Sequence, residues 1–301
     1  MGIAQYIKHI GRGRHGARAL EREQASDLMG QILDGLVTDL EIGAFCIAMR
    51  IKGETTEEMA GFLDATHARI QLIEAPLQGH TVVLPSYNGA RRLPVLTPLL
   101  AGLLAREGIA VVVHGTSTDS SRITSQAVFL EMGIGPLTKP HTAQTGKVTF
   151  APTELLHPGL KRLLEVRQVV GLRNPAHSLV KLMSITTRKA LLVSSYTHPE
   201  YATSMSSVLK LTGTNSLLLR GTEGEPVADA RRLPQIDAYI RGVRILLNEP
   251  QTGPLTLLPD LPTNIDAKTT ALYTRAVLDG QLPIPKPLAL QVKAVIQALA
   301  F

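Results

Sequence analysis

Basic residues gather in the middle of this chain of 301 residues. Eleven lysines and arginines lie between Lys139 and Arg220, whereas the same segment holds only three acids, so its excess charge is +8. The rest of the chain carries −2, which leaves a net charge of +6. An ordinary solvated face mixes both signs of charge. A segment so poor in acids favours an electropositive surface for phosphate groups, although a solvated face without a partner is the simpler interpretation.

Other combinations of reactive residues are weakly represented. No His-Glu-x-x-His motif occurs among the nine histidines, Cys46 is the only cysteine, and the Gly-x-Ser-x-Gly turn of α/β hydrolases is missing. We therefore expect neither a metal site nor an intramolecular disulfide. A lone cysteine is typical of reducing compartments, and no run reaches the roughly 18 apolar residues of a membrane helix. These features predict a cytoplasmic protein that does not enter membranes.

Two kinds of secondary structure must position these residues. Capping-box pairs at Thr38 and Glu41 and at Thr55 and Glu58 precede apolar residues at helical spacing, so the first 75 residues are predicted to be helical. Apolar, largely β-branched runs then alternate with helical stretches. The runs are 81–84, 109–114, 191–194, 217–219 and 243–247, and the helical stretches are 96–107, 125–132, 199–211, 266–278 and 288–299. This alternation predicts an α/β fold with a mostly parallel central sheet flanked by helices, plus a small helical bundle.

Several motifs resemble those of the anthranilate phosphoribosyltransferases and pyrimidine nucleoside phosphorylases. They are Ala44 to Gly61, His114-Gly115 at a strand end, Phe150-Ala151-Pro152, His157-Pro158 with Lys161, and Arg167 with Gly171 and Arg173. The resemblance covers nearly the whole chain. It implies a helical domain of residues 1–75, joined in space by about 154–186, and an α/β phosphoribosyltransferase-like domain of residues 76–301. It also implies a homodimer through the helical domains.

The residues that hold phosphoribosyl pyrophosphate and magnesium in this family are altered here. The glycine-rich turn after the first strand corresponds to Leu84-Pro85-Ser86-Tyr87-Asn88-Gly89, in which proline removes a donor and tyrosine adds bulk. The family's Lys-His-Gly-Asn becomes Val113-His114-Gly115-Thr116. Its Gly-Leu-Asp-Glu becomes Gly224-Glu225-Pro226-Val227, which keeps one acid where magnesium needs two. A proline of the anthranilate channel falls on Lys181.

Parts of the family's site persist. A vestigial phosphate loop resembles the serine-rich loop of the enzymes and consists of Ser120, Ser121, Arg122 and Ser125, with His114 beside it. For His114 we favour the interpretation of a satisfied, half-buried histidine at a strand end over that of a catalytic relic. His157-Pro158 is expected to be a turn that starts a helix.

The chain keeps the motifs of the family's fold but has lost those that hold the diphosphate and magnesium. In this it resembles the YbiB-type branch of the family, and the resemblance implies a catalytically silent dimer that binds nucleic acid. We therefore predict a homodimer that binds DNA or RNA, with no catalytic residue, metal or cofactor. The expected contacts are Lys161, Arg162, Arg167, Arg173, Lys181, Arg188, Lys189, Arg220, Arg231 and Arg232. Because the chain has no Trp, six Tyr and five Phe, binding should depend on phosphates and show little sequence preference.

Two alternatives stay open at this point. The first is an active anthranilate phosphoribosyltransferase-like glycosyltransferase, which would need phosphoribosyl pyrophosphate and Mg²⁺; the serine loop and Arg167 favour it. The second is a relic that binds an anion in the interdomain cleft without turnover.

Overall fold

The computed structural model describes residues 2–13, 15–255 and 258–301. The chain forms two units. Unit 1 consists of the residues up to Gln71 together with Thr153–Ile185, and unit 2 consists of Leu72–Pro152 together with Thr186–Phe301. Each unit is described by itself below.

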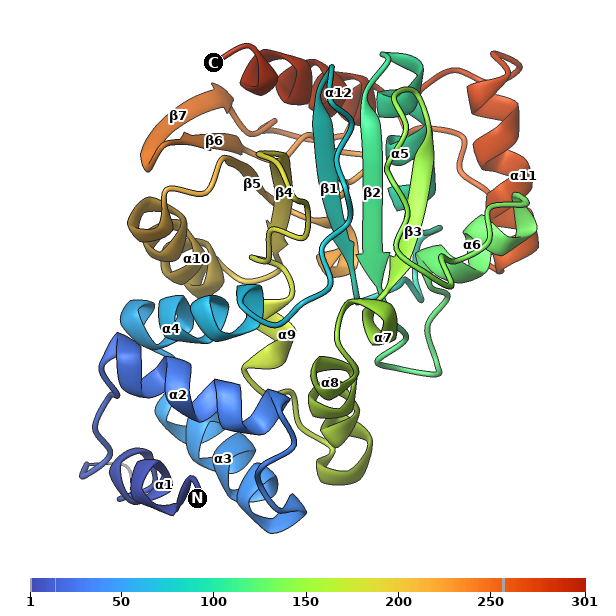
Figure 1. Cartoon of the computed structure of the whole chain (residues 1–301). Helices are drawn as coiled ribbons and strands as arrows, with labels where there is room; N and C mark the ends of the chain where they lie inside the picture. The colour runs from blue at the N-terminus through green and yellow to red at the C-terminus, as the bar shows by residue number, and fades with distance from the viewer. Residues whose placement is uncertain (1, 14, 256–257) are drawn as a thin grey trace. The chain divides into compact units, whose positions relative to one another are not determined.

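Unit 1 is a bundle of helices, drawn in blue and yellow-green in Figure 1. Its helices are α1 (Ala4–Ile10), α2 (Arg22–Leu33), α3 (Asp39–Lys52), α4 (Thr56–His67), α7 (Thr153–Leu156), α8 (Pro158–Val170) and α9 (Ala176–Leu179). Apolar faces meet in its core, where the rings of Phe45 and Phe62 lie edge to face with centroids 6.0 Å apart.

Both predicted capping boxes begin helices of unit 1, which confirms that part of the prediction. The backbone N–H of Glu41 donates to Thr38 Oγ1 over 3.3 Å, and that of Glu58 donates to Thr55 Oγ1 over 3.2 Å. Gly53 ends α3 at a φ of 79°, as expected of a glycine that follows a helix. His157 begins α8, because its Nδ1 accepts hydrogen bonds from the two N–H groups of Gly159 and Leu160.

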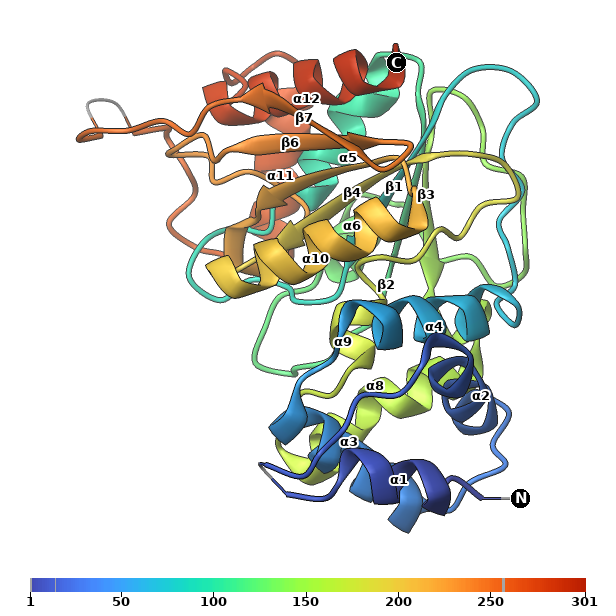
Figure 2. The same cartoon turned by 90° about the vertical axis from the view of Figure 1, so that its left-hand side faces the viewer.

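Unit 2 is built on a seven-stranded sheet with the order β3-β2-β1-β4-β5-β6-β7 (Figures 1 and 2). The strands are β1 (Thr81–Ser86), β2 (Ala110–Gly115), β3 (Val148–Pro152), β4 (Leu191–Tyr196), β5 (Ser216–Arg220), β6 (Ile236–Ile240) and β7 (Val243–Asn248). The first five strands pair in parallel, whereas β6 and β7 are antiparallel. This arrangement confirms the predicted fold class of a mostly parallel sheet with a helical bundle.

Helices cover the sheet and form the core of unit 2. They are α5 (Thr97–Arg106), α6 (Ser125–Glu131), α10 (Pro199–Thr212), α11 (Ala267–Leu278) and α12 (Lys286–Leu299), with a 3₁₀ turn η1 at Thr222–Gly224. Side chains alternate along each strand. Leu191 and Val193 of β4 therefore belong to the core cluster that includes α5 and α12, while α10 lies on the other face of the sheet (Figure 2). Within the described residues, none of the helices is long and apolar enough to span a membrane.

Candidate functional site

The carboxyl end of the parallel strands is the part of unit 2 where the family's phosphate site is expected. Three segments meet there: the loop Ser86–Leu93 after β1, the start of α6, and the segment Gly221–Glu225 after β5. Parallel strands bring such loops to one edge of a sheet. The three segments lie up to 139 residues apart in the sequence.

The carboxylate of Glu225 fills the centre of this edge. Its side chain is buried, with 1% of the residue exposed. Oε1 accepts hydrogen bonds from the backbone N–H groups of Asn88 and Gly89, both over 2.8 Å. Oε2 accepts from the hydroxyls of Ser86, Thr97 and Ser125 over 2.5, 2.9 and 3.3 Å. The acid that survives from the family's metal pair is thus fully engaged by hydrogen-bond donors.

A second carboxylate, that of Glu223, occupies the next part of the loop. Its Oε1 accepts from the consecutive backbone N–H groups of Arg91, Arg92 and Leu93 over 3.2, 2.9 and 3.2 Å. The guanidinium of Arg122 lies 3.3 Å from Oε2 and also donates to the carbonyl of Gly89. The sequence analysis does not find Glu223, although its place in the Gly-Thr-Glu-Gly-Glu segment after a strand is a usable signal.

His114, near the end of β2, and Tyr87, which follows β1, lie at the same edge of the sheet. The hydroxyl of Tyr87 lies 2.8 Å from His114 Nδ1, and the two rings meet edge to face. His114 is 0% exposed, and burial lowers its pKa to about 3, so the ring is neutral at pH 7. Its Nε2 has no hydrogen-bond partner among the described residues. His114 thus lies at a strand end, as expected, but it is fully rather than half buried, and one of its two ring nitrogens has a partner among the described residues.

The predicted vestigial phosphate loop is only partly brought together. Ser125 and Arg122 contact the carboxylates of Glu225 and Glu223. Ser120 and Ser121 are exposed, and the hydroxyl of Ser121 donates to Asp119 over 2.6 Å. In the described part of the chain, no three His, Cys, Asp or Glu side chains are grouped as metal ligands would be.

The predicted nucleic-acid contacts of unit 1 are largely engaged or buried. Lys161 pairs with Glu165 over 3.0 Å, and Arg162 pairs with Asp39 over 2.5 Å. The prediction that Lys181 contacts nucleic acid is wrong, because this residue is only 8% exposed and does not belong to an open surface.

The half-buried Arg167 and Arg173 lie near Lys181. The buried His177 shows this, because burial and, to a smaller extent, these three cations together lower its pKa to about 3. The sequence thus correctly indicates that Arg167, Arg173 and Lys181 form a cluster of cations, although this cluster is not exposed.

The predicted contacts of unit 2 differ from those of unit 1 in exposure. Arg188, Lys189 and Arg220 are exposed, and among the described residues they form no ion pair. Arg232 is half-buried and donates to the carbonyl of Gly253 over 2.9 Å. Arg231 is held by Asp229 in a two-pronged pair over 2.9 and 2.7 Å.

A hollow of about 790 Å³ lies beside Arg188 in unit 2. It is lined by Leu72, Glu74, Pro140, His141, Thr142, Thr187 and Arg188, and the hydroxyl of Thr142 donates to Glu74 Oε2 over 2.7 Å. The exposed Lys139 and Lys189 adjoin these two segments. We call Lys139, His141, Arg188 and Lys189 the basic rim. Sequence reasoning counts Lys139 in the basic segment but predicts neither it nor His141 as a contact, because the two segments of the rim lie 47 residues apart in numbering, from His141 to Arg188.

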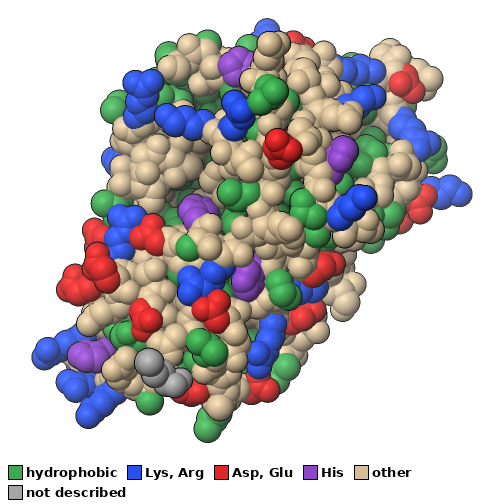
Figure 3. Space-filling view, in the orientation of Figure 1, with side chains coloured by type: hydrophobic (Ala, Val, Ile, Leu, Met, Phe, Trp, Pro, Cys, Tyr) green, Lys and Arg blue, Asp and Glu red, His purple; other side chains and the backbone are tan. Residues whose placement is uncertain are grey.

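Charge is also distributed unevenly on the face drawn in Figure 3. Acidic side chains gather over α2 and α4 of unit 1, whereas lysines and arginines gather over β6 and β7 of unit 2. The exposed cations on or beside these strands include Lys210, Arg241 and Arg244, of which Arg244 pairs with Asp237.

Comparisons with known proteins agree with this architecture. The helical-bundle domain model of the glycosyl transferase family matches residues 4–69. The chain is 40% identical to the uncharacterized protein YbiB of Escherichia coli, over 99% of this chain and 94% of YbiB. The chain belongs to the family of YbiB and the anthranilate phosphoribosyltransferases. An anthranilate phosphoribosyltransferase of Streptomyces griseus is 27% identical over 87% of this chain and 75% of that enzyme.

The solved structures give the same fold. The crystal structure of anthranilate phosphoribosyltransferase from Thermus thermophilus superimposes with a TM-score of 0.71 at 20% identity, covering 97% of this chain and 87% of that one. Family membership therefore accounts for the fold. What distinguishes this chain at the end of the parallel strands is that the carboxylates of Glu223 and Glu225 accept hydrogen bonds from the N–H groups of the loop.

Proposed function

We propose that this chain binds nucleic acid through backbone phosphates, as a homodimer, and that it transfers no phosphoribosyl group. The exposed cations of unit 2 that form no ion pair among the described residues carry this proposal. In the part of the basic segment that belongs to unit 2, six lysines and arginines face one acid, Glu200. All six are exposed: Lys139, Lys147, Arg188, Lys189, Lys210 and Arg220. Such surplus charge releases counterions when it meets a polyanion.

The state of the phosphate site supports the absence of transfer. A phosphoribosyltransferase needs free N–H groups for the diphosphate and free acids for magnesium. Here the N–H groups of Asn88 and Gly89 already donate to Glu225, and those of Arg91 to Leu93 already donate to Glu223. Tyr87 also fills space next to this loop and is 3% exposed.

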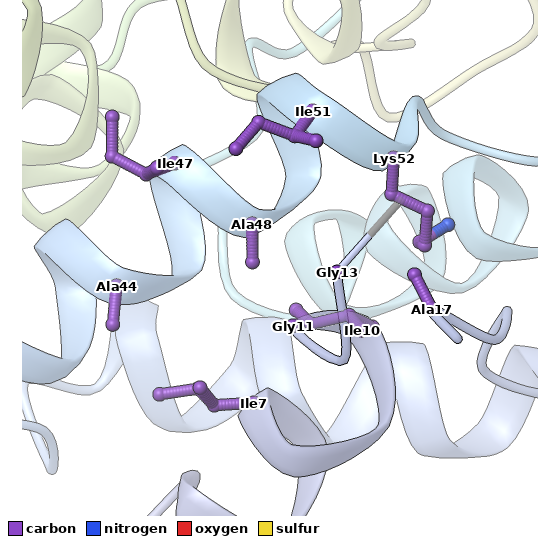
Figure 4. Close-up of a pocket in the computed structure, with 10 residues that line it drawn as sticks. All are labelled: Ile7, Ile10, Gly11, Gly13, Ala17, Ala44, Ile47, Ala48, Ile51 and Lys52. Carbon is purple, nitrogen blue, oxygen red and sulfur yellow. The ribbon is translucent and has the colours of Figure 1, made fainter. Parts of the chain in front are cut away.

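An apolar stripe on α3 supports the homodimer. Leu40, Ala44, Ile47 and Ile51 recur at helical spacing, and Leu40 and Ile51 are 84% and 68% exposed. A groove of about 450 Å³ lies between α1 and α3, and Ala44, Ile47 and Ile51 of the stripe are among the residues that line it. Figure 4 shows Ala44 and Ala48 turned toward Ile7 of α1 at this groove. A ridge and a groove on one face are self-complementary, so a second copy related by a two-fold axis covers both.

A salt titration of oligonucleotide binding tests the proposal. We expect log K to fall linearly with log salt, with a slope that counts the phosphate contacts. The double variant Arg188→Ala/Lys189→Ala should reduce the slope by about 1.4–1.8 for each protomer that contacts the strand, because each contact contributes about 0.7–0.9. Lys268→Ala/Lys293→Ala, which removes two exposed cations of α11 and α12, is the matched control.

Two outcomes would overturn the proposal. Binding that ignores salt, or absence of binding at low salt, would remove the phosphate contacts on which it depends. Calorimetric binding of phosphoribosyl pyrophosphate with Mg²⁺ by the unaltered protein would instead favour the alternative of an active phosphoribosyltransferase.

A further inference from the structure

The loop Ser86–Leu93 has the chemistry of an anion-binding site that already holds an anion. Glu225 is buried, yet its five donors are neutral, and among the described residues no cation pairs with it. Burying a carboxylate without a cation is costly unless hydrogen bonds replace its water. Two N–H groups and three hydroxyls supply that replacement, and they converge on one carboxylate from β1, the loop, α5 and α6.

Glu223 extends this pattern to a second anion position. The three consecutive N–H groups of Arg91 to Leu93 point at its carboxylate, as in the backbone nests that hold anions in proteins. Together, Glu223 and Glu225 place two negative charges against five N–H groups of one loop. Two adjacent negative groups against successive N–H donors match the chemistry of a diphosphate.

The backbone conformation of Glu223 and Gly224 places both carboxylates against the loop. Glu223 has a φ of 51°, a left-handed backbone conformation that is costly for glutamate and persists only where contacts hold it. A Cβ on Gly224 would lie 1.9 Å from Asn88 Nδ2, so only glycine allows this close approach. Asn88 Nδ2 in turn donates to the carbonyl of Glu223 over 2.9 Å.

We propose that Glu223 and Glu225 are internal anions that keep this loop closed against external diphosphates. The contact is autoinhibitory in the literal sense: the chain's own carboxylates take the donors that a diphosphate would need. It follows that removing the carboxylates exposes five N–H donors and creates a site for inorganic pyrophosphate. This inference deepens the part of the proposed function that concerns the absence of phosphoribosyl transfer, and it does not depend on nucleic-acid binding.

Thermal unfolding with and without pyrophosphate tests this inference. In Glu223→Ala/Glu225→Ala, we expect a lower midpoint than in the unaltered protein and a rise of about 2–4 °C when pyrophosphate saturates the new site. The unaltered protein and the control Glu249→Ala, which removes an exposed acid after β7, should show no such rise. An equal rise in all three proteins, or no rise in the double variant, would overturn the inference.

Amide measurements locate the effect and keep the test decisive if the double variant fails to fold. In Glu225→Gln, whose side chain keeps its volume, hydrogen exchange at Asn88 and Gly89 should be about tenfold faster or more, because charged acceptors are lost. In Glu223→Ala, pyrophosphate should shift the amide signals of Arg91 to Leu93. Unchanged exchange and unshifted signals in both single variants would contradict the inference.

Discussion

At the scale of single residues, His114 shows how burial changes a side chain's chemistry. The ring lies under the closed loop, with the Tyr87 hydroxyl 2.8 Å from Nδ1. Its pKa is lowered to about 3 because burial penalises the charged imidazolium. A histidine that stays neutral at pH 7 and is sealed from solvent does not exchange protons with a substrate, and its role is to fill and rigidify the end of β2.

This burial predicts acid sensitivity. Above pH 6.5 the ring is neutral in both the folded and the unfolded chain, so it contributes no pH dependence. Between pH 6.5 and about 3 the unfolded chain binds a proton that the folded chain does not. The free energy of unfolding should therefore fall with falling pH, by up to about 1.4 kcal/mol per pH unit from this group.

The double variant Tyr87→Phe/His114→Phe isolates the contribution of His114 to the pH dependence of stability. It removes both partners of the hydrogen bond together, so neither is left buried without a partner. Urea unfolding followed by circular dichroism should give a shallower loss of stability below pH 6.5 than in the unaltered protein. Above pH 7 the two stability curves should run parallel. An unchanged slope between pH 6 and 4.5 would show that His114 takes up its proton in the folded state.

Residue types in the sequence indicate some of these roles and hide others. The resemblance to the family identifies Gly224-Glu225 as a damaged metal motif, but it cannot indicate that Glu225 accepts from Asn88, 137 residues away. Likewise, Lys181 carries a charge in the sequence whatever its burial, and only packing shows that it is 8% exposed. Contacts between distant segments, rather than local pattern, decide both cases.

At the scale of elements, the turn between β6 and β7 carries a cation in an unfavourable conformation. Arg241 has a φ of 51° and Gly242 a φ of 82°. A two-residue hairpin turn with both values positive favours Asn-Gly, so arginine is a poor choice on conformational grounds alone. An outlier of this kind suggests a functional reason, and here Arg241 is exposed beside Lys210, whose carbonyl the turn approaches.

We therefore expect Arg241→Asn to stabilise the fold and to weaken nucleic-acid binding. The free energy of unfolding should rise by about 0.5–1 kcal/mol, and the salt slope of binding should fall by about 0.7–0.9 for each protomer that contacts the strand. Gly242→Ala is the contrasting variant, because its Cβ would lie 2.8 Å from the Lys210 carbonyl oxygen and should destabilise the turn. A stabilised Arg241→Asn protein with unchanged affinity would exclude Arg241 from the binding surface.

Strand prediction succeeds where a run is mostly apolar, even when it is as short as 217–219, and fails where an acid or a proline interrupts the run. The run Ala110–Gly115 is entirely buried and was predicted as a strand, as were four others. The sequence analysis does not identify β3 and β6. The first has half-buried residues at its start and ends on Pro152, and the second contains Asp237, which the hairpin partner Arg244 neutralises over 3.0 Å. A strand that an acid interrupts in this way can be predicted only when the residue that pairs with this charge on the neighbouring strand is known.

At the scale of the whole molecule, a homodimer would present two copies of the basic rim to one strand of nucleic acid. Binding of the second copy then becomes intramolecular and raises the affinity without any new contact. Long strands that reach both copies gain from this effect, whereas short strands do not. The α3 stripe and the basic rim are therefore linked through the length of the ligand.

Ile51→Glu tests this link, because it places a charge at one end of the exposed stripe, on a side chain that is 68% exposed, while leaving the cations of unit 2 intact. We expect sedimentation to show a monomer. The monomer's affinity for a long oligonucleotide should fall on the order of 10²-fold, and its salt slope should be about half that of the dimer. Its affinity for a short oligonucleotide should barely change. Leu272→Glu, on an exposed position of α11, should remain dimeric and bind both lengths normally. Equal losses on both lengths would mean that α3 itself contacts nucleic acid, and a dimeric Ile51→Glu protein would place the interface elsewhere.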